Sequence, residues 1–376
     1  MKMVPLGEVV EFLDHLRKPV TAADRATGPY PYYGANGQQG TIDSYIFNEP
    51  LLLLAEDGGH FDNPSRGIAY RISGASWVNN HAHVLRMTSA LDIGFAHRVL
   101  ATMDVRKYVT GTTRAKLTKS GAAKIEIPLP PLPEQRRIAA ILDHADALRA
   151  RRRQVISHLD DLAQSIFLDM FGYFDGEYST VEGIARSAKG SIRTGPFGSQ
   201  LLHSEFVDAG IAVLGLDNVV GNEFSWGERR YITPEKYEDL RRYTVSPGDV
   251  LVSIMGTCGR CVVVPAEVGK AINTKHICAI TLDYQRALPE FVRAAFLWHP
   301  RSRRHLKQQT KGSIMDGLNM GIVKAMPLPV PDIQIQREFV ARLNAVGVAS
   351  RSCVLSATNL EYAFASLQSR AFRGEL

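Results

Sequence analysis

The chain has 376 residues, of which 45% are apolar and 22% are charged, an ordinary composition for a globular protein with two or more domains. It has no run of eighteen apolar residues, and its start, MKMVPLGEVVEF, lacks a signal-peptide core. We therefore expect no membrane span and a cytoplasmic location. Four cysteines are too few for a disulfide framework. The net charge of +6 is compatible with nucleic-acid binding but does not require it.

The first segment of the chain, residues 1–133, is predicted to be rich in strands. The run YPYYGANGQQGTIDSYIF has turn signals at Gly34, Asn36-Gly37 and Gly40 between β-prone stretches. The stretch PLLLLAED resembles a short buried strand, and RISGASWVNNHAHVLRM resembles a strand pair. A helix rich in basic residues, ALDIGFAHRVLATM, follows these strands.

A proline-rich strip, PLPPLPEQRR, occupies residues 128–137. Proline fixes φ and removes a backbone donor, so the strip is predicted to be extended rather than helical. A helix can begin directly after it, because proline is tolerated at a helix start and Glu134 suits the positive end of the helix dipole. The sequence thus predicts a rigid stalk that leads into a helix over 134–173.

The helix after this strip has an apolar seam that advances by three and four residues in turn. Its positions are 138, 141, 145, 148, 152, 155, 159, 162, 166 and 169, and eight of these ten residues are apolar. A 3.5-residue period sustained over several heptads is typical of a coiled coil. A helix of roughly 37 residues would be about 55 Å long at 1.5 Å per residue, longer than a usual globular helix.

The second half of the chain repeats this order. Residues 174–331 are again predicted to be strand-rich: GDVLVSIMGTCGRCVVVP resembles two strands around a Gly256–Gly259 turn, and VGKAINTKHICAITL resembles another strand pair. The basic stretch LPEFVRAAFLWHPRSRRHLKQQT is predicted to be one helix. The strip PLPVPDIQIQR then leads from Asp332, a suitable N-cap, into a helix over 332–376. Seven of its nine seam positions are apolar: 339, 342, 346, 349, 353, 356, 360, 363 and 367.

The two halves are related by an internal repeat. A shift of 201 positions aligns residues 111–171 with 312–372 without a gap. The identities fall at the loop glycines, the strip prolines and one helical face. They include Gly111/Gly312, Leu117/Leu318, Pro128/Pro329, Gln135/Gln336, Arg136/Arg337 and Phe171/Phe372. We therefore predict an α+β fold with two strand-rich domains in a pseudo-twofold repeat and two long helices that pack on each other. The alternative is two amphipathic helices in separate globular cores.

No recognisable catalytic motif occurs in the sequence. There is no Walker loop, no GxGxxG after a strand, no HExxH and no complete motif of an amino-methyltransferase. Cys258 and Cys261 have the spacing of metal ligands, but no second pair accompanies them and zinc normally takes four ligands. His81 and His83 fit one face of a strand, where a ligand pair is the alternative to surface or DNA-facing histidines. We expect no catalytic residue and no metal.

Two matching stretches are rich in basic residues that could neutralise phosphates. They are Arg98, Arg106, Lys107, Arg114, Lys116 and Lys119 in the first half, and Arg293, Arg301, Arg303, Arg304, Lys307 and Lys311 in the second. Base reading requires donors and acceptors in loops, with Asn and Gln suited to adenine and Arg to guanine. The candidates of the first half are Asn36, Gln38, Gln39, Asn79, Asn80, His81, Arg114 and Lys116. Those of the second half are Arg193, Asn218, Ser253, Thr257, Arg260, Lys275, Lys311 and Ser313. For any one of them a solvated surface role is the alternative.

A separate basic cluster, Arg149 and Arg151–Arg153, lies halfway along the first helix. Arg152 interrupts the apolar seam, where a charge is costly unless it reaches solvent or an acid. We interpret the cluster as a solvated face, with DNA or an acidic partner as the alternatives.

PLPPLPEQRRIAAIL, its degenerate partner PLPVPDIQIQREFVARL and the GTTRAKL and GSIMDGLN loops resemble the specificity subunit of type I restriction–modification systems. The second copy departs from the first at Ile335, which stands in the place of Glu134. The resemblance implies target-recognition domains at 1–133 and 174–331 that read the two halves of a gapped, asymmetric DNA site. It implies long spacer helices at 134–173 and 332–376 that pair antiparallel and act as a ruler.

The resemblance also implies partners. Two methyltransferase subunits would bind the helices, nuclease–translocase subunits could join them, and S-adenosylmethionine would bind in the methyltransferase rather than in this chain. We take Gln135, Arg136, Gln336 and Arg337 as candidates for contact with the partner. The prediction is thus a non-catalytic module that binds double-stranded DNA. The alternatives are a catalytically active methyltransferase or nuclease, and a coiled-coil scaffold that reads no sequence.

Overall fold

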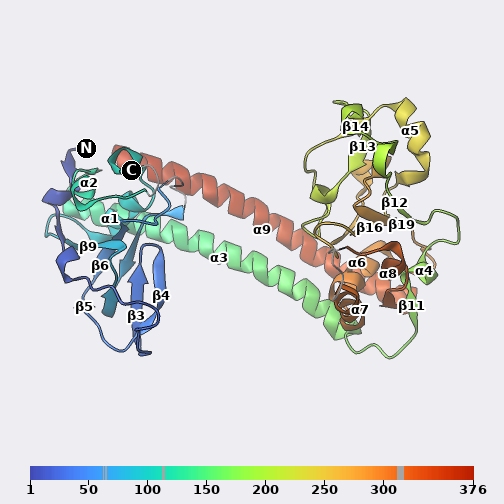
Figure 1. The fold of residues 1–376 in the computed structure, drawn as a ribbon, viewed down its shortest axis with the longest axis horizontal. Helices are drawn as coiled ribbons and strands as arrows, with labels where there is room; N and C mark the ends of the chain where they lie inside the picture. Colours follow the sequence, from blue (N-terminus) through green and yellow to red (C-terminus); the bar gives the residue numbers. More distant parts are fainter. Residues whose placement is uncertain (62, 64–65, 112–114, 311–316) are drawn as a thin grey trace. The chain divides into compact units, whose positions relative to one another are not determined.

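The structure is a computed structural model that describes residues 1–61, 63, 66–111, 115–310 and 317–376. These residues form two compact units, each with its own sheets and helices (Figure 1). Unit 1 comprises Met1–Gln154 together with Leu355–Leu376, and unit 2 comprises Val155–Val354. The prediction of an α+β fold with two strand-rich parts is confirmed.

Unit 1 is built from three small sheets in its described part. The first has the order β2 (Val10–Phe12), β9 (Ala82–Met87), β6 (Leu51–Ala55) and β7 (Ala69–Ile72). The second has the order β4 (Gly37–Ile42), β3 (Tyr30–Gly34), β8 (Ala75–Val78) and β5 (Phe47–Asn48). A two-stranded sheet pairs β1 (Met3–Pro5) with β10 (Glu126–Pro128), and the short helices are α1 (Ile93–Ala101) and α2 (Lys119–Ala123).

Unit 2 repeats this plan over its described residues. One sheet has the order β12 (Ile192–Thr194), β19 (Ile277–Ile280), β16 (Val250–Ser253) and β17 (Cys261–Val263). The other has the order β14 (Tyr231–Ile232), β13 (Ile211–Leu214), β18 (Ala271–Asn273) and β15 (Thr244–Val245). Strand β11 (Tyr178–Thr180) pairs with β20 (Pro327–Pro329). The helices are α4 (Val181–Ile184), α5 (Pro234–Leu240), α6 (Pro289–Trp298), α7 (Pro300–Thr310) and α8 (Met320–Lys324).

The strand orders of the two units correspond one to one. Each unit has one parallel strand pair, β3 with β8 in unit 1 and β13 with β18 in unit 2, while the other pairs of named strands are antiparallel. The predicted repeat therefore holds for the whole strand framework, although the sequence comparison aligned only the strips and helices. Shared topology fixes which loops of unit 2 correspond to which loops of unit 1.

The start of each proline strip lies in an edge strand, as proline chemistry requires. Strand β10 pairs with β1 and strand β20 with β11, so neither strip has to supply a backbone donor on a second side. Helix α3 (Leu132–Phe171) begins inside the first strip, two residues before the predicted start at 134, and α9 (Ile333–Arg373) begins inside the second. The Asp332 carboxylate accepts a hydrogen bond from the backbone N–H of Gln334 at 2.7 Å, which confirms the predicted N-cap.

The two long helices pack against each other in opposite directions within each unit. In unit 1, Ile138 and Leu142 of α3 share a buried cluster with Phe364 and Ala371, near the end of α9. In unit 2, the end of α3 meets the start of α9, where the rings of Phe167 and Phe171 lie 5.5 and 5.7 Å from the ring of Phe339. The antiparallel pairing that the resemblance implied is therefore present in both units.

The predicted seam has the right period, but every second position is one residue off. In α3, Ile138 is buried as expected, whereas Leu148 is 38% and Leu162 is 45% exposed. The buried residues are Leu142 and Ala163, one position beyond the expected 141 and 162. In α9, Phe364 is likewise buried in place of position 363. Leucine and valine on both sides of the seam made the two registers equally apolar in the sequence.

The predicted basic helix of the second half is two helices. α6 ends at Trp298 and α7 begins at Pro300, with His299 in an extended conformation between them. The break follows from proline, which has no N–H to continue the helix and which disfavours helical geometry in the preceding residue. No described helix of the chain is long and apolar enough to span a membrane.

Candidate nucleic-acid interface

Loops from three parts of unit 1 meet at one edge of its sheets. The Asn36 side chain donates a hydrogen bond to the carbonyl of Gly58 at 2.9 Å, which ties the β3–β4 turn to the loop after β6. His81, in the β8–β9 turn, contacts the Asp57 carboxylate at 2.6 Å. Asp57 in turn forms a β-bridge with Lys116. Most of the first-half candidates are thus neighbours, although up to 80 residues separate them in the chain.

The exposed donors and acceptors of this edge are amides. Asn36, Gln38, Gln39 and Asn80 are exposed, as is Lys116. Asn79 has a different role, because it is buried, donates to the Gln39 side chain at 3.1 Å and accepts from the His81 backbone at 2.8 Å. The structure therefore brings together exposed side chains that suit adenine edges. Asn79 instead stabilises the β8–β9 turn through its two hydrogen bonds.

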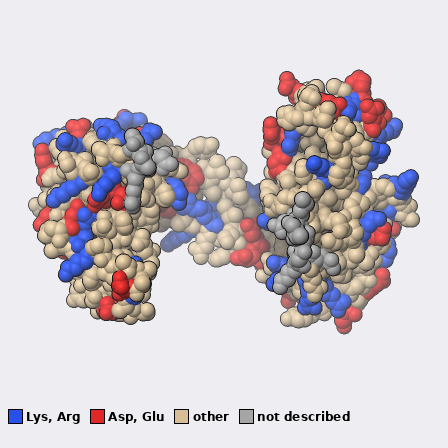
Figure 2. Space-filling model, viewed as in Figure 1, with Lys and Arg blue, Asp and Glu red and all other residues tan. Residues whose placement is uncertain are grey.

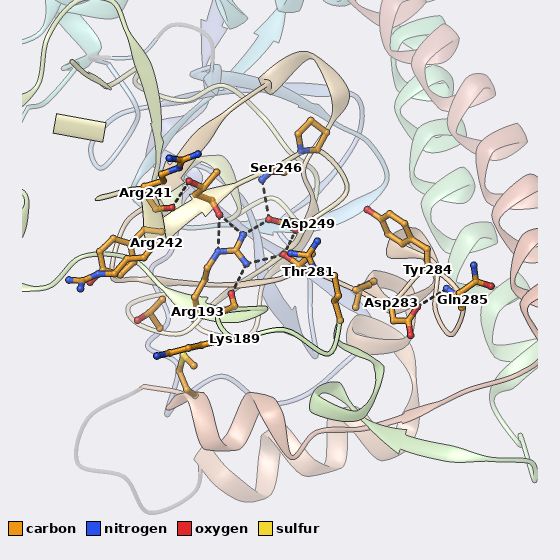
Figure 3. A pocket seen from close by; sticks show the side chains of 18 residues that line it. Lys189, Arg193, Arg241, Arg242, Ser246, Asp249, Thr281, Asp283, Tyr284 and Gln285 are labelled. Carbon is orange, nitrogen blue, oxygen red and sulfur yellow. Dashed lines mark hydrogen bonds and ion pairs between the residues drawn. The ribbon is translucent and has the colours of Figure 1, made fainter. Parts of the chain in front are cut away.

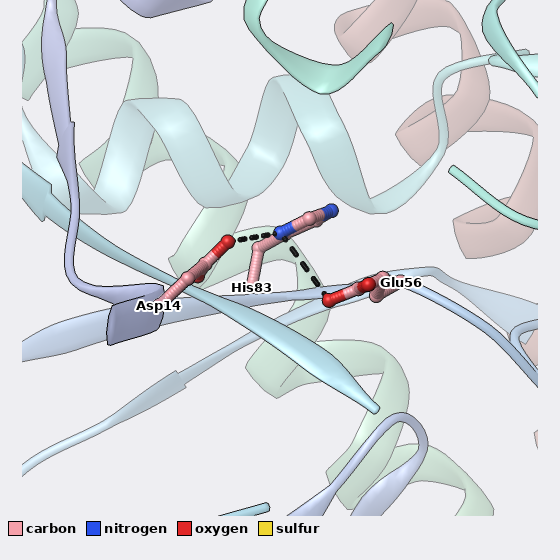
Figure 4. Close-up of side chains that lie close together, drawn as sticks. All are labelled: Asp14, Glu56 and His83. Atoms are coloured by element: carbon pink, nitrogen blue, oxygen red, sulfur yellow. Dashed lines mark hydrogen bonds and ion pairs between the residues drawn. The ribbon is translucent and has the colours of Figure 1, made fainter. Parts of the chain in front are cut away.

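A charged network adjoins this edge through Lys116, and Figure 4 shows three of its members, Asp14, Glu56 and His83. The Arg17 guanidinium donates to the Glu56 carboxylate at 2.6 Å, and Lys116 contacts the other oxygen of Glu56 at 2.9 Å. The ring of His83, which is 1% exposed, lies 2.6 Å from Asp14 and 3.7 Å from Glu56. Asp14, Glu56 and His83 are groups of metal-ligand type, but cations of the chain itself contact both carboxylates.

The carboxylates of this network are held in their charged form. Burial acts to raise the pKa of Asp14, but hydrogen bonds from His83 and from the Val84 backbone, with the charges of His83 and Arg17, outweigh it, so the pKa is lowered. Burial opposes the hydrogen bonds of Arg17 and Lys116 in the same way at Glu56, where the pKa is also lowered. Each carboxylate therefore stabilises unit 1 above its ordinary pKa, and this contribution is lost as the pH falls through the lowered value.

In unit 2 the corresponding edge is bounded by a basic groove. The groove has a volume of about 1020 Å³ and lies between the β16–β17 turn and α7. Its cationic lining residues are Arg260 of the turn and Arg303, Arg304 and Lys307 of α7, and no acidic residue lines it among those described. Arg303 and Arg304 are exposed. Such a surface favours a chain of phosphates, since no described acid pairs with Arg303 or Arg304.

The other second-half candidates divide into exposed and internal ones. Thr257 is exposed and Lys275 is half-buried, in the turns that correspond to the reading loops of unit 1. Ser253 and Asn218 are buried: Ser253 accepts from the Arg260 backbone at 2.9 Å, and Asn218 accepts from the Gly215 backbone at 2.8 Å. These two shape the loops. Arg114, Lys311 and Ser313 lie outside the described residues.

Arg193 is part of an internal ion pair beside a large pocket of about 1130 Å³ (Figure 3). Its guanidinium contacts the nearly buried Asp249 carboxylate at 2.5 Å and donates to the Thr281 hydroxyl at 2.9 Å. Thr281 also contacts Asp249 at 2.6 Å. Arg193 lies in β12, Asp249 directly before β16 and Thr281 directly after β19, so the charge of Arg193 is paired at this end of the sheet.

The basic residues predicted to contact phosphates in unit 1 are largely paired with acids. Arg98 contacts Asp143 at 2.6 Å and Asp146 at 3.0 Å, and Arg106 contacts Asp104. In the helical cluster, Arg149 and Arg153 both reach Glu361 of α9. Figure 2 shows acidic side chains interspersed among basic ones on the face it draws. The cations of α7 differ from these because no described acid lies within ion-pair distance of Arg303 or Arg304.

The partner candidates at the helix starts divide in the same way. Gln135 and Gln336 are fully buried, and each makes three hydrogen bonds to the backbone of its own unit. A side chain without exposed surface cannot itself contact a partner in this conformation. Arg136 and Arg337 are exposed, and direct contact stays a prediction for these two. Sequence reasoning missed Asp14, Arg17 and Glu56, for which only the nearby His81/His83 pair gave a signal.

Three comparisons with known proteins agree. A family model described as the type I restriction modification DNA specificity domain matches residues 1–158. A Haemophilus influenzae protein named as a type I restriction enzyme specificity subunit is 31% identical over 267 residues, which cover 70% of this chain and 68% of the relative. The EcoBI specificity subunit of Escherichia coli is 25% identical over 66% of this chain and 58% of its own length. The type I S subunit of M. genitalium shares the fold, with a TM-score of 0.63, 14% identity and coverage of 99% and 96% of the two chains.

The basic groove predicts a salt-dependent contact. We expect Arg303→Ala with Arg304→Ala to weaken DNA binding by the complex at low salt. The slope of log affinity against log salt should also fall by about 0.9 for each phosphate that the variant no longer neutralises. The measurement is a salt titration of binding, with Arg106→Ala as the control, because this exposed arginine is already paired with Asp104. Equal slopes for the double variant and the wild type would exclude the groove as a phosphate-binding surface.

Proposed function

The chain belongs to the family of type I restriction enzyme specificity subunits, and on this premise we propose that it reads a gapped, asymmetric site on double-stranded DNA, one half with each unit. The observation that carries the proposal is the repeated strand order with different side chains at the matching edges. Two units with the same strand order but different side chains at the edge suit two half-sites of different sequence, because bases are distinguished by their donors and acceptors.

The two edges would read DNA by different chemistry. Unit 1 presents exposed amides, which suit adenine, around the β3–β4 and β8–β9 turns. Unit 2 presents Thr257, Arg260 and Lys275, beside the phosphate-binding cations of α7. We assign target-recognition domains to residues 1–133 and 174–331, and the spacer helices to 134–173 and 332–376. The helices would set the gap between the half-sites.

The helix pair offers a place for a partner. In unit 1 an apolar groove of about 480 Å³ runs between α3 and α9. It is lined by Ala140, Ile141, His144, Ala145, Leu148, Leu360, Ala363, Phe364 and Leu367. Unit 2 has exposed apolar side chains on the same helices, Leu162 at 45% and Val348 at 59%. We propose that each unit binds one methyltransferase subunit through an amphipathic helix, with Arg136 and Arg337 at the edges of the contact.

Catalysis would then belong to the partners. The chain acts as a non-catalytic subunit in the cytoplasm, while the methyltransferase subunits bind S-adenosylmethionine and methylate adenine. Nuclease–translocase subunits would join the same complex. The absence of a nucleotide or cofactor motif from the sequence supports this division.

Exchange of one recognition segment tests the proposal. Residues 1–130 are replaced by the matching segment of another specificity subunit, with a second hybrid that also carries the donor's counterpart of residues 355–376. The methylated motif is then determined by genome sequencing in cells that express the partner methyltransferase. We expect only one half of the motif to change. A change in both halves contradicts independent reading, and methylation without any sequence preference favours the scaffold alternative.

The groove of unit 1 makes a separate prediction about assembly. Ala363→Glu places a charge in the groove and should weaken methyltransferase binding by about tenfold or more, since a buried unpaired charge costs well over 1.4 kcal/mol. Ala147→Glu is the matched control, because Ala147 is an exposed alanine of α3 that does not line the groove. Both variants are compared by calorimetric titration with the methyltransferase subunit. Equal affinities would rule out docking at this groove.

A further inference from the structure

His83 links two parts of unit 1 through both nitrogens of its ring. Nδ1 lies 2.6 Å from the Asp14 carboxylate and Nε2 lies 2.8 Å from the carbonyl of Leu117. Both partners are acceptors, so both hydrogen bonds form together only when each ring nitrogen carries a proton. Asp14 also accepts from the Val84 backbone at 2.9 Å, which fixes the carboxylate between β2 and β9.

The carbonyl bonded to His83 is that of Leu117, the residue that directly follows Lys116. The Leu117 N–H donates to the carbonyl of Glu56 at 2.8 Å. Lys116 and Thr110 exchange two backbone hydrogen bonds of 2.8 Å, and the Lys116 ammonium reaches the Glu56 carboxylate. The chain from Asp14 through His83 to Leu117 thus fixes the position of Lys116 at the reading edge.

In unit 2, uncharged residues stand at the positions that correspond to Asp14, Glu56 and His83. Cys278 faces Val252 in the register in which His83 faces Leu54, so the two positions correspond. By the same registers Asp14 corresponds to Thr194 and Glu56 to Ile254. The bond from the Leu318 N–H to the carbonyl of Ile254 is also 2.8 Å, as in its unit 1 counterpart. The same strand framework therefore forms in unit 2 without a charged pair at this place.

We propose that Asp14 and His83 are positioning residues for the first half-site: they act through Leu117 to hold Lys116 in the DNA-reading arrangement, and this hold depends on pH. The proposal rests on the proposed function. When the pH rises and the ring loses one proton, a nitrogen lone pair faces an oxygen and one hydrogen bond breaks. The charged groups that face the ring are Asp14, Glu56, Arg17 and Lys116.

At low pH the contact between Asp14 and His83 is weakened by protonation of the Asp14 carboxylate. Its pKa is lowered, so the stabilisation by its carboxylate is fully present above the ordinary value and is lost as the pH falls through the lowered one. Both hydrogen bonds of the pair therefore need a charged Asp14 carboxylate and a proton on each ring nitrogen of His83. Unit 2, with Thr194 and Cys278 at these places, lacks this dependence.

The test removes the pair without leaving a charge unpaired. Asp14→Thr with His83→Cys installs the unit 2 residues, and a neutral replacement of a buried ion pair is compatible with folding. The variant is assembled with the methyltransferase, and methylation rates are measured on oligonucleotides mismatched in the first or the second half-site. Cys278→Ala is the matched control in unit 2, and thermal melting monitors the fold of each variant.

We expect the double variant to lose about tenfold or more of its discrimination at the first half-site and to keep discrimination at the second. Wild-type discrimination at the first half-site should be lower when the His83 ring has lost a proton than when both ring nitrogens carry protons, while discrimination at the second half-site stays constant across the same pH series. The pH profile needs no variant and therefore stands even where a variant melts early.

Unchanged first-half discrimination in the double variant, or parallel pH profiles for the two halves, would overturn the inference. Equal loss at both halves would overturn it as well, because it would mean that the pair supports the fold in general. A wild-type complex with no preference at either half-site would contradict the proposed function itself. These results differ from one another, so the failure of one proposal is not mistaken for the failure of the other.

Discussion

Each unit has the end of a long helix in its core, and in unit 1 this helix end comes from a distant part of the chain. Ala371 and Phe364 of α9 belong to the buried core of unit 1, and Phe167 and Phe171 of α3 belong to that of unit 2. The hydrophobic burial of these residues removes apolar surface at about 25 cal/mol per Å², so the helix ends are an integral part of each core. The core of unit 1 therefore cannot form from a contiguous stretch of sequence, whereas unit 2 is contiguous. In unit 1 this requirement brings the end of α9 against the start of α3, so the helix pair is antiparallel there.

A polar contact complements this apolar one at the start of each helix. Gln135 accepts from the Asp92 backbone and donates to the carbonyls of Ala90 and Pro130, and Gln336 makes the corresponding three bonds. A buried amide with its donors and acceptors satisfied fixes geometry, because the removal of any partner would leave an unpaired group. The identity of these glutamines in the repeat therefore has a structural cause: they fix the first turn of each helix to the strands and loops of its own unit.

The sequence was sufficient for features that repeat and for those set by proline. The shift of 201 positions, the extended strips and the long helices followed from residues such as Pro128 and Pro329. The exact seam did not follow, because Leu148 and Leu162 are as apolar as the residues that are buried. The break at His299 could have been predicted from Pro300, since proline at that place interrupts the backbone hydrogen bonds.

Charge pairing between distant residues was the hardest feature to predict. Arg98 and Arg193 looked available in the sequence, yet Asp143 and Asp249 neutralise them within their units. The network of Asp14, Glu56 and His83 joins positions that only the β2, β6 and β9 strands bring together. No spacing along the chain marks such ion pairs. The sequence therefore indicated which residues have suitable side chains for DNA contact, but not which of them are exposed and which are internal.

The most direct test of this account is hydrogen–deuterium exchange of an Ala371→Glu variant. Ala371 is fully buried at the far end of α9, where a carboxylate would lie unpaired among apolar side chains. If α9 completes unit 1, exchange in Leu51–Ala55 should accelerate by about tenfold or more, while Val250–Ser253 in unit 2 keeps its wild-type protection. Unchanged protection of Leu51–Ala55 would contradict the claim that unit 1 needs the distant helix end.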